Sequence, residues 1–226
     1  MYFLDASKAF DIQAGFRKDG STTQQILMLR LLAEKAKRKG NKIYNCFVDF
    51  QKAFDSLDQQ STWAIMKSYG IEEIVKILQL INTDAKAAVR IRGELGEWFN
   101  ITRGTRQGDN VSPKTFIGHL ERVMDKNKEC GKGISINGVK IDNLRFADDI
   151  DLLEESPQEL QRSLQLLSNE GRKTGLVIKT ITMVIGSPLI KKKLKVDGQE
   201  VENVTEFVYL GSLMTYDDIS VNNNAV

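Results

Sequence analysis

The stretch IYNCFVDF, residues 43–50, decides the fold. It is rich in β-branched and aromatic residues, a composition that predicts a buried β-strand. Asp49 stands near its end, directly after the apolar pair Phe47 and Val48. Because the backbone of a strand is stiff, a carboxylate at this place is fixed in position and faces a cleft. We therefore expect a functional site where this strand ends.

The sequence around Asp49 occurs twice in the chain. Residues 49–55 read DFQKAFD and residues 5–11 read DASKAFD, so the pattern D-x-x-K-A-F-D returns 44 positions later. Nothing else recurs at this interval, which argues against a tandem repeat. One copy is then the working site and the other is a stray segment.

Bulk composition excludes several classes of protein. A chain of 226 residues with 41% hydrophobic content is long enough for one sizeable core. Two cysteines and one histidine form neither a disulfide framework nor a zinc pattern, and no apolar run of roughly 18 residues predicts a membrane span. No signal peptide is recognisable, so we expect a nuclear or cytoplasmic protein. A net charge of +2 means that any nucleic-acid surface has to be local.

Strands that carry aspartates alternate with amphipathic helices. This pattern predicts an α+β fold in which an antiparallel sheet has helices packed on one face. The expected helices are 22–39, 61–70, 71–82, one that begins at Ser112 and Pro113, and 157–174; the expected hairpins are 86–102, 133–141 and 143–153; the last strand-like segments are 176–178, 182–185, 194–201 and 207–213.

A second acidic site lies at Asp148 and Asp149, between Phe146 and Ile150. Carboxylates that lie close together repel each other and lose hydration, and a divalent cation relieves both penalties. Mg²⁺ is commonly held by one or two carboxylates together with substrate phosphates, and two such ions can assist phosphoryl transfer. The alternative is a solvated acidic turn, which is how we interpret the pair Asp217 and Asp218.

A third stretch, RGTRQGDNVSP at 103–113, brackets Arg106 and Gln107 with two glycines and a helix-opening Ser-Pro. Glycine lets a backbone approach a ligand closely, and the flat amide of Gln107 can rest near a base or a sugar. A polar turn without function is the alternative.

These stretches, in this order, resemble the reverse transcriptases of non-long-terminal-repeat (LINE-type) retrotransposons, especially RTE-like and jockey-like elements. The resemblance runs from about Ile12 to Leu213 and rests on QAGFRKDGSTTQQ (13–25), FVDFQKAFDSLD (47–58), RGTRQGDNVSP, NLRFADDIDLL (143–153) and EFVYLGSL (206–213). It implies a polymerase palm with fingers, and an RNA-directed DNA polymerase that extends a DNA primer on an RNA template with deoxynucleoside triphosphates. It also implies two Mg²⁺ ions, for which Mn²⁺ could substitute.

The resemblance assigns roles to individual residues. Asp49, Asp148 and Asp149 would be catalytic, with both metals held by Asp49, Asp148 and the backbone of Phe50. Phe54 would be a steric gate against ribonucleotides, unless its ring only packs in the core. The remaining assignments are Arg17, Lys18, Gln51, Phe54 and Gln107 for the nucleotide, and Tyr209, Leu210 and Gly211 for the primer grip.

The resemblance also divides the chain. Residues 1–11 precede the fingertip motif, so Asp5 is expected to be silent and this segment to be displaced. Residues 12–215 would form the fingers (mainly 12–42 and 60–105) and the palm (43–59 and 106–215), followed by a frayed tail at 216–226. A thumb and the endonuclease of the parent element are expected to be missing.

Two positions depart from the family pattern. The stretch 175–185 reads GLVIKTITMVI. The resemblance assigns Ile181 to the place of a lysine that would protonate pyrophosphate, and Lys179 could replace it from two residues away on the same face of a strand. The fingertip lacks one arginine and carries Asp19. Two alternatives to an active polymerase therefore stay open, a remnant that only binds nucleic acid and a different two-metal phosphoryl-transfer enzyme such as a nuclease.

Overall fold

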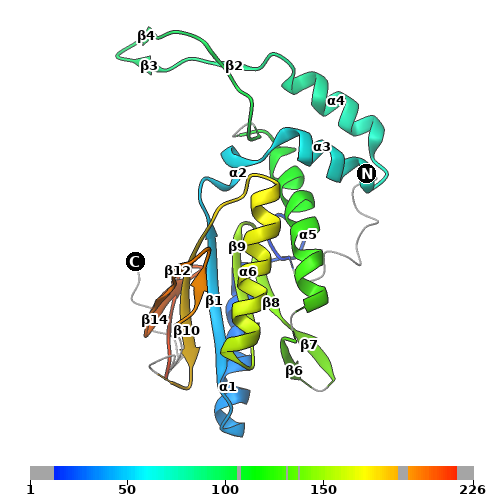
Figure 1. Ribbon diagram of the computed structural model, residues 1–226. Coiled ribbons are helices and arrows are strands. Elements are labelled where there is room, and N and C mark those ends of the chain that lie inside the picture. The colour runs from blue at the N-terminus through cyan, green and yellow to red at the C-terminus, as the bar shows by residue number, and fades with distance from the viewer. Residues whose placement is uncertain (1–12, 106–107, 131, 137, 188–192, 218–226) are drawn as a thin grey trace.

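The structure, a computed structural model, describes residues 13–105, 108–130, 132–136, 138–187 and 193–217. A central sheet is sandwiched between helices, and a smaller helical part with a protruding hairpin stands beyond one end of the sheet (Figure 1). The helices are α1 (Thr22–Lys39), α2 (Ala53–Ser56), α3 (Gln59–Ser68), α4 (Glu72–Asn82), α5 (Ser112–Cys130) and α6 (Pro157–Lys173). The strands are β1 (Ile43–Phe50), β2 (Lys86–Ala87), β3 (Arg90–Ile91), β4 (Glu94–Leu95), β5 (Phe99–Asn100), β6 (Ile134–Ile136), β7 (Val139–Ile141), β8 (Asn143–Phe146), β9 (Asp149–Glu154), β10 (Ile178–Ile185), β11 (Lys195–Val196), β12 (Gln199–Glu200), β13 (Glu202–Asn203), β14 (Glu206–Tyr209) and β15 (Ser212–Thr215).

β1 is the middle strand of a five-stranded sheet with the order β13-β10-β1-β9-β8. It pairs antiparallel with β10 along its whole length and antiparallel with β9 from Tyr44 to Val48. Only β13 runs parallel to its neighbour. The expected strand at 43–50 is confirmed residue for residue, because a strand buried on both faces is largely apolar and needs no alternation to be recognised.

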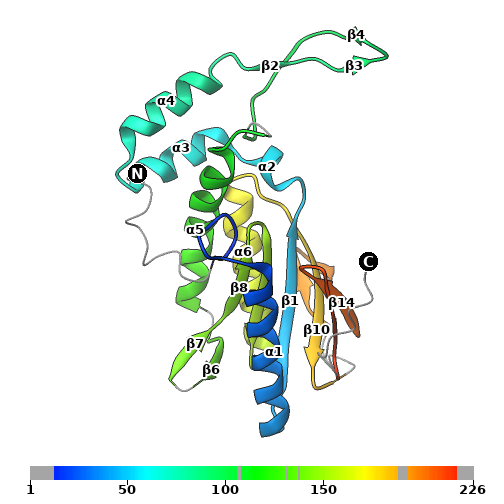
Figure 2. The same ribbon diagram turned by 180° about the vertical axis from the view of Figure 1, so that it is seen from behind.

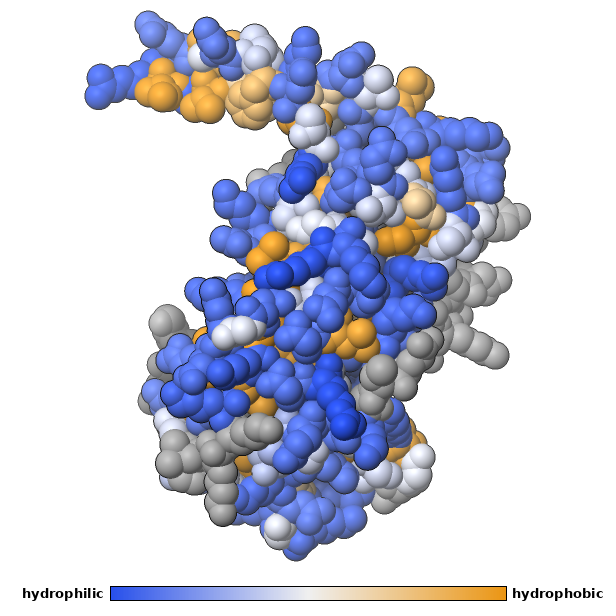
Figure 3. All heavy atoms as spheres, viewed as in Figure 1, coloured by the Kyte–Doolittle hydropathy of each residue, from blue (hydrophilic) through white to orange (hydrophobic). Residues whose placement is uncertain are grey.

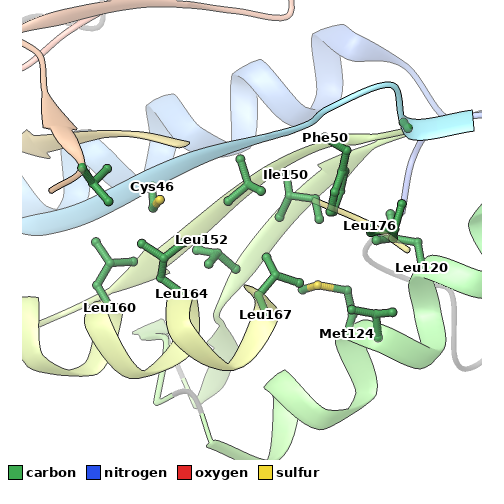
Figure 4. Close-up of a cluster of buried hydrophobic side chains, with 14 of the residues drawn as sticks. Cys46, Phe50, Leu120, Met124, Ile150, Leu152, Leu160, Leu164, Leu167 and Leu176 are labelled. Atoms are coloured by element: carbon green, nitrogen blue, oxygen red, sulfur yellow. The ribbon is translucent and has the colours of Figure 1, made fainter. Parts of the chain in front are cut away.

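The two faces of β1 face two separate cores. Cys46, Val48 and Phe50 point towards α5 and α6, where their side chains meet a row of leucines (Figure 4). Ile43 and Phe47 point the other way, towards α1 and the β14–β15 hairpin. Each fully buried side chain of this size contributes about 1.5–3 kcal/mol through the hydrophobic effect.

The predicted α+β fold with an antiparallel sheet is confirmed, and one layer was not foreseen. α5 and α6 cover one face as expected, and α1 covers the opposite face, where Figure 2 shows it in front of β1 and β8. The apolar stripe of α1 (Leu29, Leu32, Ala33 and Ala36) is what packs against the sheet.

Helix ends follow the capping residues in the sequence. Ser21 and Gln24 form a capping box at the start of α1, and Gly40 ends the helix in the left-handed conformation with φ of 68°. Ser156 caps α6. α3 begins two residues before the predicted Ser61, because Asp58 is its N-cap and accepts from the Ser61 N–H.

The end of the chain differs from expectation in one respect. Residues 176–178 and 182–185 were predicted as two strands. The structure has one continuous strand here, β10, which runs from Ile178 to Ile185. Each of the eight residues of β1 pairs with one residue of β10, and this pairing keeps the polar Lys179 and Thr180 within the strand. At the tail, Tyr216 is hydrogen-bonded on both sides, to Thr205 and Gly186.

α3, α4 and the β2–β5 and β3–β4 pairs form a separate part with a small core around Trp63, Met66, Val75 and Leu78. The paired strands extend well beyond the rest of the molecule (Figure 1). Apolar side chains of this arm stay exposed, among them Ile91, Trp98 and Phe99, and Figure 3 shows an orange patch along it. Within the described residues, no helix is both long and apolar enough to cross a membrane.

Candidate active site

The structure brings the three predicted carboxylates to one end of the sheet. Asp49 is the second-last residue of β1, Asp148 lies in the two-residue turn between β8 and β9, and Asp149 opens β9. Since Val48 pairs with Ile150, the next step of the antiparallel register sets Asp49 against Asp149. Nearly one hundred residues of chain separate these groups, and pairing of β1 with β9 removes that separation.

The carboxyl groups of Asp148 and Asp149 have raised pKa values. Burial raises the pKa of the Asp148 carboxyl, its own backbone hydrogen bond lowers it, and the charge of Asp49 raises it further. Burial, then Asp148, then Asp49 raise the pKa of Asp149. By surface area Asp148 is half-buried, whereas Asp49 and Asp149 are exposed. The carboxylates therefore repel one another at the edge of the solvent, and a divalent cation would relieve that repulsion.

The donors at this site fit a hard cation. They are carboxylate oxygens, the type of ligand that Mg²⁺ and Mn²⁺ prefer, and the backbone carbonyl of Phe50, the last residue of β1, stays a predicted further ligand. Within the described part of the chain, however, no three His, Cys, Asp or Glu side chains are grouped closely enough to hold a metal ion by themselves. Any ion would need water or substrate phosphate as further ligands, as is usual for Mg²⁺.

A pocket of about 210 Å³ opens beside the carboxylates. Asp49 and Asp149 lie on its wall together with Lys179 and Ile181 from β10. Lys179 is the direct cross-strand partner of Asp49. The structure thus brings both positions discussed for the family lysine to the same pocket, one with a cation and one with an aliphatic side chain.

The predicted primer-grip residues lie next to this pocket. Tyr209 ends β14 and lines the pocket, and its ring centroid is 5.5 Å from that of Phe47. Burial, followed by the charges of Asp151 and Asp149, raises the Tyr209 pKa far above its usual value. Leu210 and Gly211 form the turn to β15, both with positive φ, 49° and 84°. Such a turn is typical of two-residue hairpins.

The predicted nucleotide-binding residues fall into three groups. Arg17 and Lys18 lie in the loop 13–20, and the Arg17 guanidinium donates to the Gln13 carbonyl at 3.4 Å. Gln51 is exposed, but its backbone N–H already donates to the Val177 carbonyl at 2.8 Å. A phosphate would have to displace that bond to use this amide. Gln107 lies outside the described residues.

Phe54 is half-buried and packs on Phe116, with ring centroids 4.6 Å apart. The core-packing alternative therefore has direct support, although the ring is not fully enclosed. A partly exposed ring that is braced from behind is also what a steric gate requires. The position of Phe54 is therefore compatible both with packing in the core and with a steric gate.

The loop that precedes Gln107 is docked on the segment after Asp49. The Gly104 N–H donates to Leu57 O and the Thr105 N–H donates to Phe54 O, at 2.8 and 2.9 Å. A Cβ at Gly104 would overlap the backbone of Asp55, and φ is +80° there, so glycine is required. The close approach that Gly104 allows is to the protein's own backbone, and an approach of this motif to a ligand stays a prediction.

Two buried polar residues near the carboxylates were not singled out from the sequence. Gln13 is 2% exposed and bonds to the turn that carries Asp148. Asp151 is fully buried, accepts from Asn45 Nδ2 at 2.9 Å, and has its pKa raised by burial. A polar residue inside an apolar strand is a signal for Asp151, whereas Gln13 has no such signal because its neighbours are loop residues.

Comparison with known proteins gives the family. Residues 2–212 match the family described as reverse transcriptase (RNA-dependent DNA polymerase). The chain belongs to this family. The match begins at residue 2, so it does not set residues 1–11 apart. These residues lie outside the described part, and their origin as a displaced segment stays a prediction, as does the division into fingers and palm.

Relatives in sequence are retrotransposon proteins. A Pol polyprotein of a type-1 retrotransposable element R2 from Nasonia vitripennis is 27% identical over 189 residues, which cover 82% of this chain and 18% of the relative. One from Popillia japonica is 28% identical over 206 residues, 84% of this chain and 34% of the relative. The chain thus spans about a fifth to a third of these relatives. Kinship with non-LTR retrotransposons is confirmed, and the finer RTE-like or jockey-like assignment stays a prediction.

Solved telomerases share the fold. Telomerase from Candida tropicalis in complex with a fragment of telomeric RNA has a TM-score of 0.64 and 14% identity, with all of this chain and 36% of that chain covered. The apo form has a TM-score of 0.65, with 98% and 39% covered. At this identity the likeness establishes the fold alone.

Proposed function

We propose that this chain carries the RNA-directed DNA polymerase chemistry of a retrotransposon, adding deoxynucleotides to a DNA primer on an RNA template. The observation that carries the proposal is the meeting of Asp49 with Asp148 and Asp149 at one sheet end, in a chain that belongs to the reverse transcriptase family. A nuclease is disfavoured by that membership.

In this reaction the oxygen of the primer 3′-hydroxyl bonds to the α-phosphorus of the triphosphate, and pyrophosphate leaves. Two Mg²⁺ ions, or Mn²⁺ in their place, would activate the hydroxyl and offset charge on the leaving group. Asp49, Asp148 and the Phe50 carbonyl would hold them, and Asp149 would complete the acidic cluster. Arg17 and Lys18 would meet the phosphates, where cations offset the charge that develops.

The proposed partners follow from the same chemistry. Tyr209, Leu210 and Gly211 would support the primer end beside the pocket. Gln51 and Gln107 would contact the incoming nucleotide, and Phe54 would exclude a 2′-hydroxyl. The thumb and the endonuclease would be supplied by the longer parent protein. The reaction would take place in the nucleus or cytoplasm, where template RNA is present.

A second function, nucleic-acid binding without turnover, is favoured by one observation. Ile181 lines the pocket where a lysine is expected, and Lys179 would have to serve from the position opposite Asp49. If Lys179 cannot do so, release of pyrophosphate lacks its proton donor. The chain would then keep the fold and its binding of nucleic acid, but it would add nucleotides very slowly or not at all.

Primer extension on an RNA template with Mg²⁺ and deoxynucleotides tests the proposal. Asp148→Asn should abolish extension. Asp5→Asn should leave extension unchanged, because Asp5, the counterpart of Asp49 in the other copy of the D-x-x-K-A-F-D pattern, lies in the N-terminal segment that is expected to be silent. Retained RNA–DNA binding without extension by the wild type would favour the remnant. Extension that survives Asp148→Asn would refute the site.

A further inference from the structure

The side chain of Gln13 makes three hydrogen bonds, each of 2.8 Å. Two of them go to Ala147 in the β8–β9 turn (Ala147 and Asp148), which is called the catalytic turn below. Gln13 Nε2 donates to the Ala147 carbonyl, and Gln13 Oε1 accepts from the N–H groups of Ala147 and Gly15. With 2% exposure, this amide has no access to water that could replace these bonds. It is therefore the sole partner shown for both backbone groups of Ala147 among the described residues.

Ala147 is the first residue of the β8–β9 turn and directly precedes Asp148. Its φ is +57°, a left-handed conformation that costs a non-glycine residue free energy. Such a conformation persists only where surrounding contacts hold it. The Ala147 carbonyl belongs to the peptide bond that leads to Asp148, so the bond from Gln13 Nε2 fixes the plane from which the Asp148 side chain departs.

Backbone contacts join the two segments over more than one residue. The Ala14 N–H donates to the Arg145 carbonyl at 2.9 Å, and Gln13 and Arg145 form an isolated parallel bridge. A Cβ at Gly15 would overlap the Ala147 nitrogen. The loop 13–20 therefore lies directly on the catalytic turn, where Figure 2 shows it in dark blue above α1.

The same loop carries the cations proposed for the triphosphate. The Arg17 guanidinium donates to the Gln13 carbonyl, so one residue contacts both the turn through its side chain and Arg17 through its backbone. Gln13 is thus the physical link between the loop that carries Arg17 and the turn that carries Asp148.

We propose that Gln13 is a positioning residue that clamps the Ala147–Asp148 turn onto the nucleotide-facing loop 13–20 and thereby sets the orientation of Asp148. Its effect on turnover rests on the proposed function. Its effect on the turn does not, because the three hydrogen bonds exist in the chain alone.

Hydrogen exchange measured by mass spectrometry on the 226-residue chain tests the clamp directly. Gln13→Met keeps the length of the side chain and removes all three hydrogen bonds. Exchange in the 144–150 region should therefore speed up by at least about tenfold, which is the effect of a single lost buried hydrogen bond. Gln24→Met is the matched control. It removes the same kind of amide from the start of the neighbouring helix α1, where Gln24 belongs to the exposed capping box. Hydrogen exchange at residues 144–150 should stay unchanged in this variant.

Steady-state kinetics separates positioning from folding. Gln13→Met should lower kcat about tenfold and change the KM for deoxynucleotide less than about threefold, since Arg17 and Lys18 remain. If Gln13→Met loses its fold, Gln13→Asn replaces it, because the amide stays polar but is one methylene too short to keep its contacts with Ala147. Its kcat should then fall while its circular dichroism stays that of the wild type.

Unchanged exchange at 144–150 in Gln13→Met, or an unchanged kcat in folded Gln13→Asn, would overturn the clamp. Failure of the wild type to extend a primer would count against the proposed function alone, because the exchange experiment still decides whether Gln13 holds the turn.

Discussion

Asp49 and Lys179 are direct cross-strand partners on β1 and β10, and both line the pocket beside the acidic cluster. A cation at that position lies next to the carboxylates that are proposed to hold metal. Under the proposed function it would meet the same substrate phosphates. Ile181, on the same face one pleat further along, offers no charge.

Lys179→Met is expected to lower kcat about a hundredfold if Lys179 donates the proton to pyrophosphate, which is the scale of general acid catalysis. Primer extension under single-turnover conditions measures it. Lys173→Met, an exposed lysine on α6 that pairs with Glu170, serves as the control. Equal rates for Lys179→Met and the wild type would exclude the lysine from the chemistry.

Phe54→Ala is expected to raise incorporation of ribonucleotides about tenfold or more relative to deoxynucleotides, because the bulky ring would no longer meet the 2′-hydroxyl. Competition between the two nucleotides in primer extension measures the ratio. Phe116→Leu disturbs the same ring contact from the buried side. If both variants change the ratio equally, packing and not the gate explains the selectivity.

Stability is expected to fall in acid through His119. Burial lowers its pKa to about 4, and its Nδ1 lies 3.0 Å from the Thr62 hydroxyl. Since the unfolded chain binds the proton first, the free energy of unfolding keeps this contribution above about pH 6.5 and loses it as pH falls towards 4, by about 3 kcal/mol at most. Urea unfolding of the wild type and His119→Gln, compared across this range, isolates the contribution; parallel curves would contradict it.

Arg145→Met is expected to destabilise the chain by about 3–5 kcal/mol, because it removes the guanidinium that pairs with the buried Glu121 carboxylate. The Arg145 guanidinium is 2.7 Å from the Glu121 carboxylate, and both side chains are almost completely buried. Chemical denaturation measures the loss. The double variant Arg145→Met with Glu121→Gln should regain part of it, and no recovery would mean that packing of the arginine stem dominates.

Elements with a strong local signal could be predicted from the sequence. The capping box at Ser21 and the stop at Gly40 are local, and so is the apolar run of β1, which is why their bounds agree with the structure. β10 was not predicted as one strand, because the polar Lys179 and Thr180 interrupt its apolar residues, and pairing with β1 is what includes them in the strand. α1 was recognised as a helix, but its place on the second face depends on contacts with distant strands.

The same division applies to the site. Asp49, Asp148 and Asp149 stood out from the sequence because each interrupts or ends an apolar run. Gln13 did not, since its role exists only where its amide meets Ala147, 134 positions away.

By itself, the sequence determined the residue types, the local elements and the family, because propensity, capping and motif order act over short distances. Only the tertiary structure decided which carboxylates share one end of the sheet, which lysine stands opposite Asp49, and which amide holds the turn at Ala147. These relations depend on strand register and close packing between distant segments, and no local stretch of sequence encodes them alone.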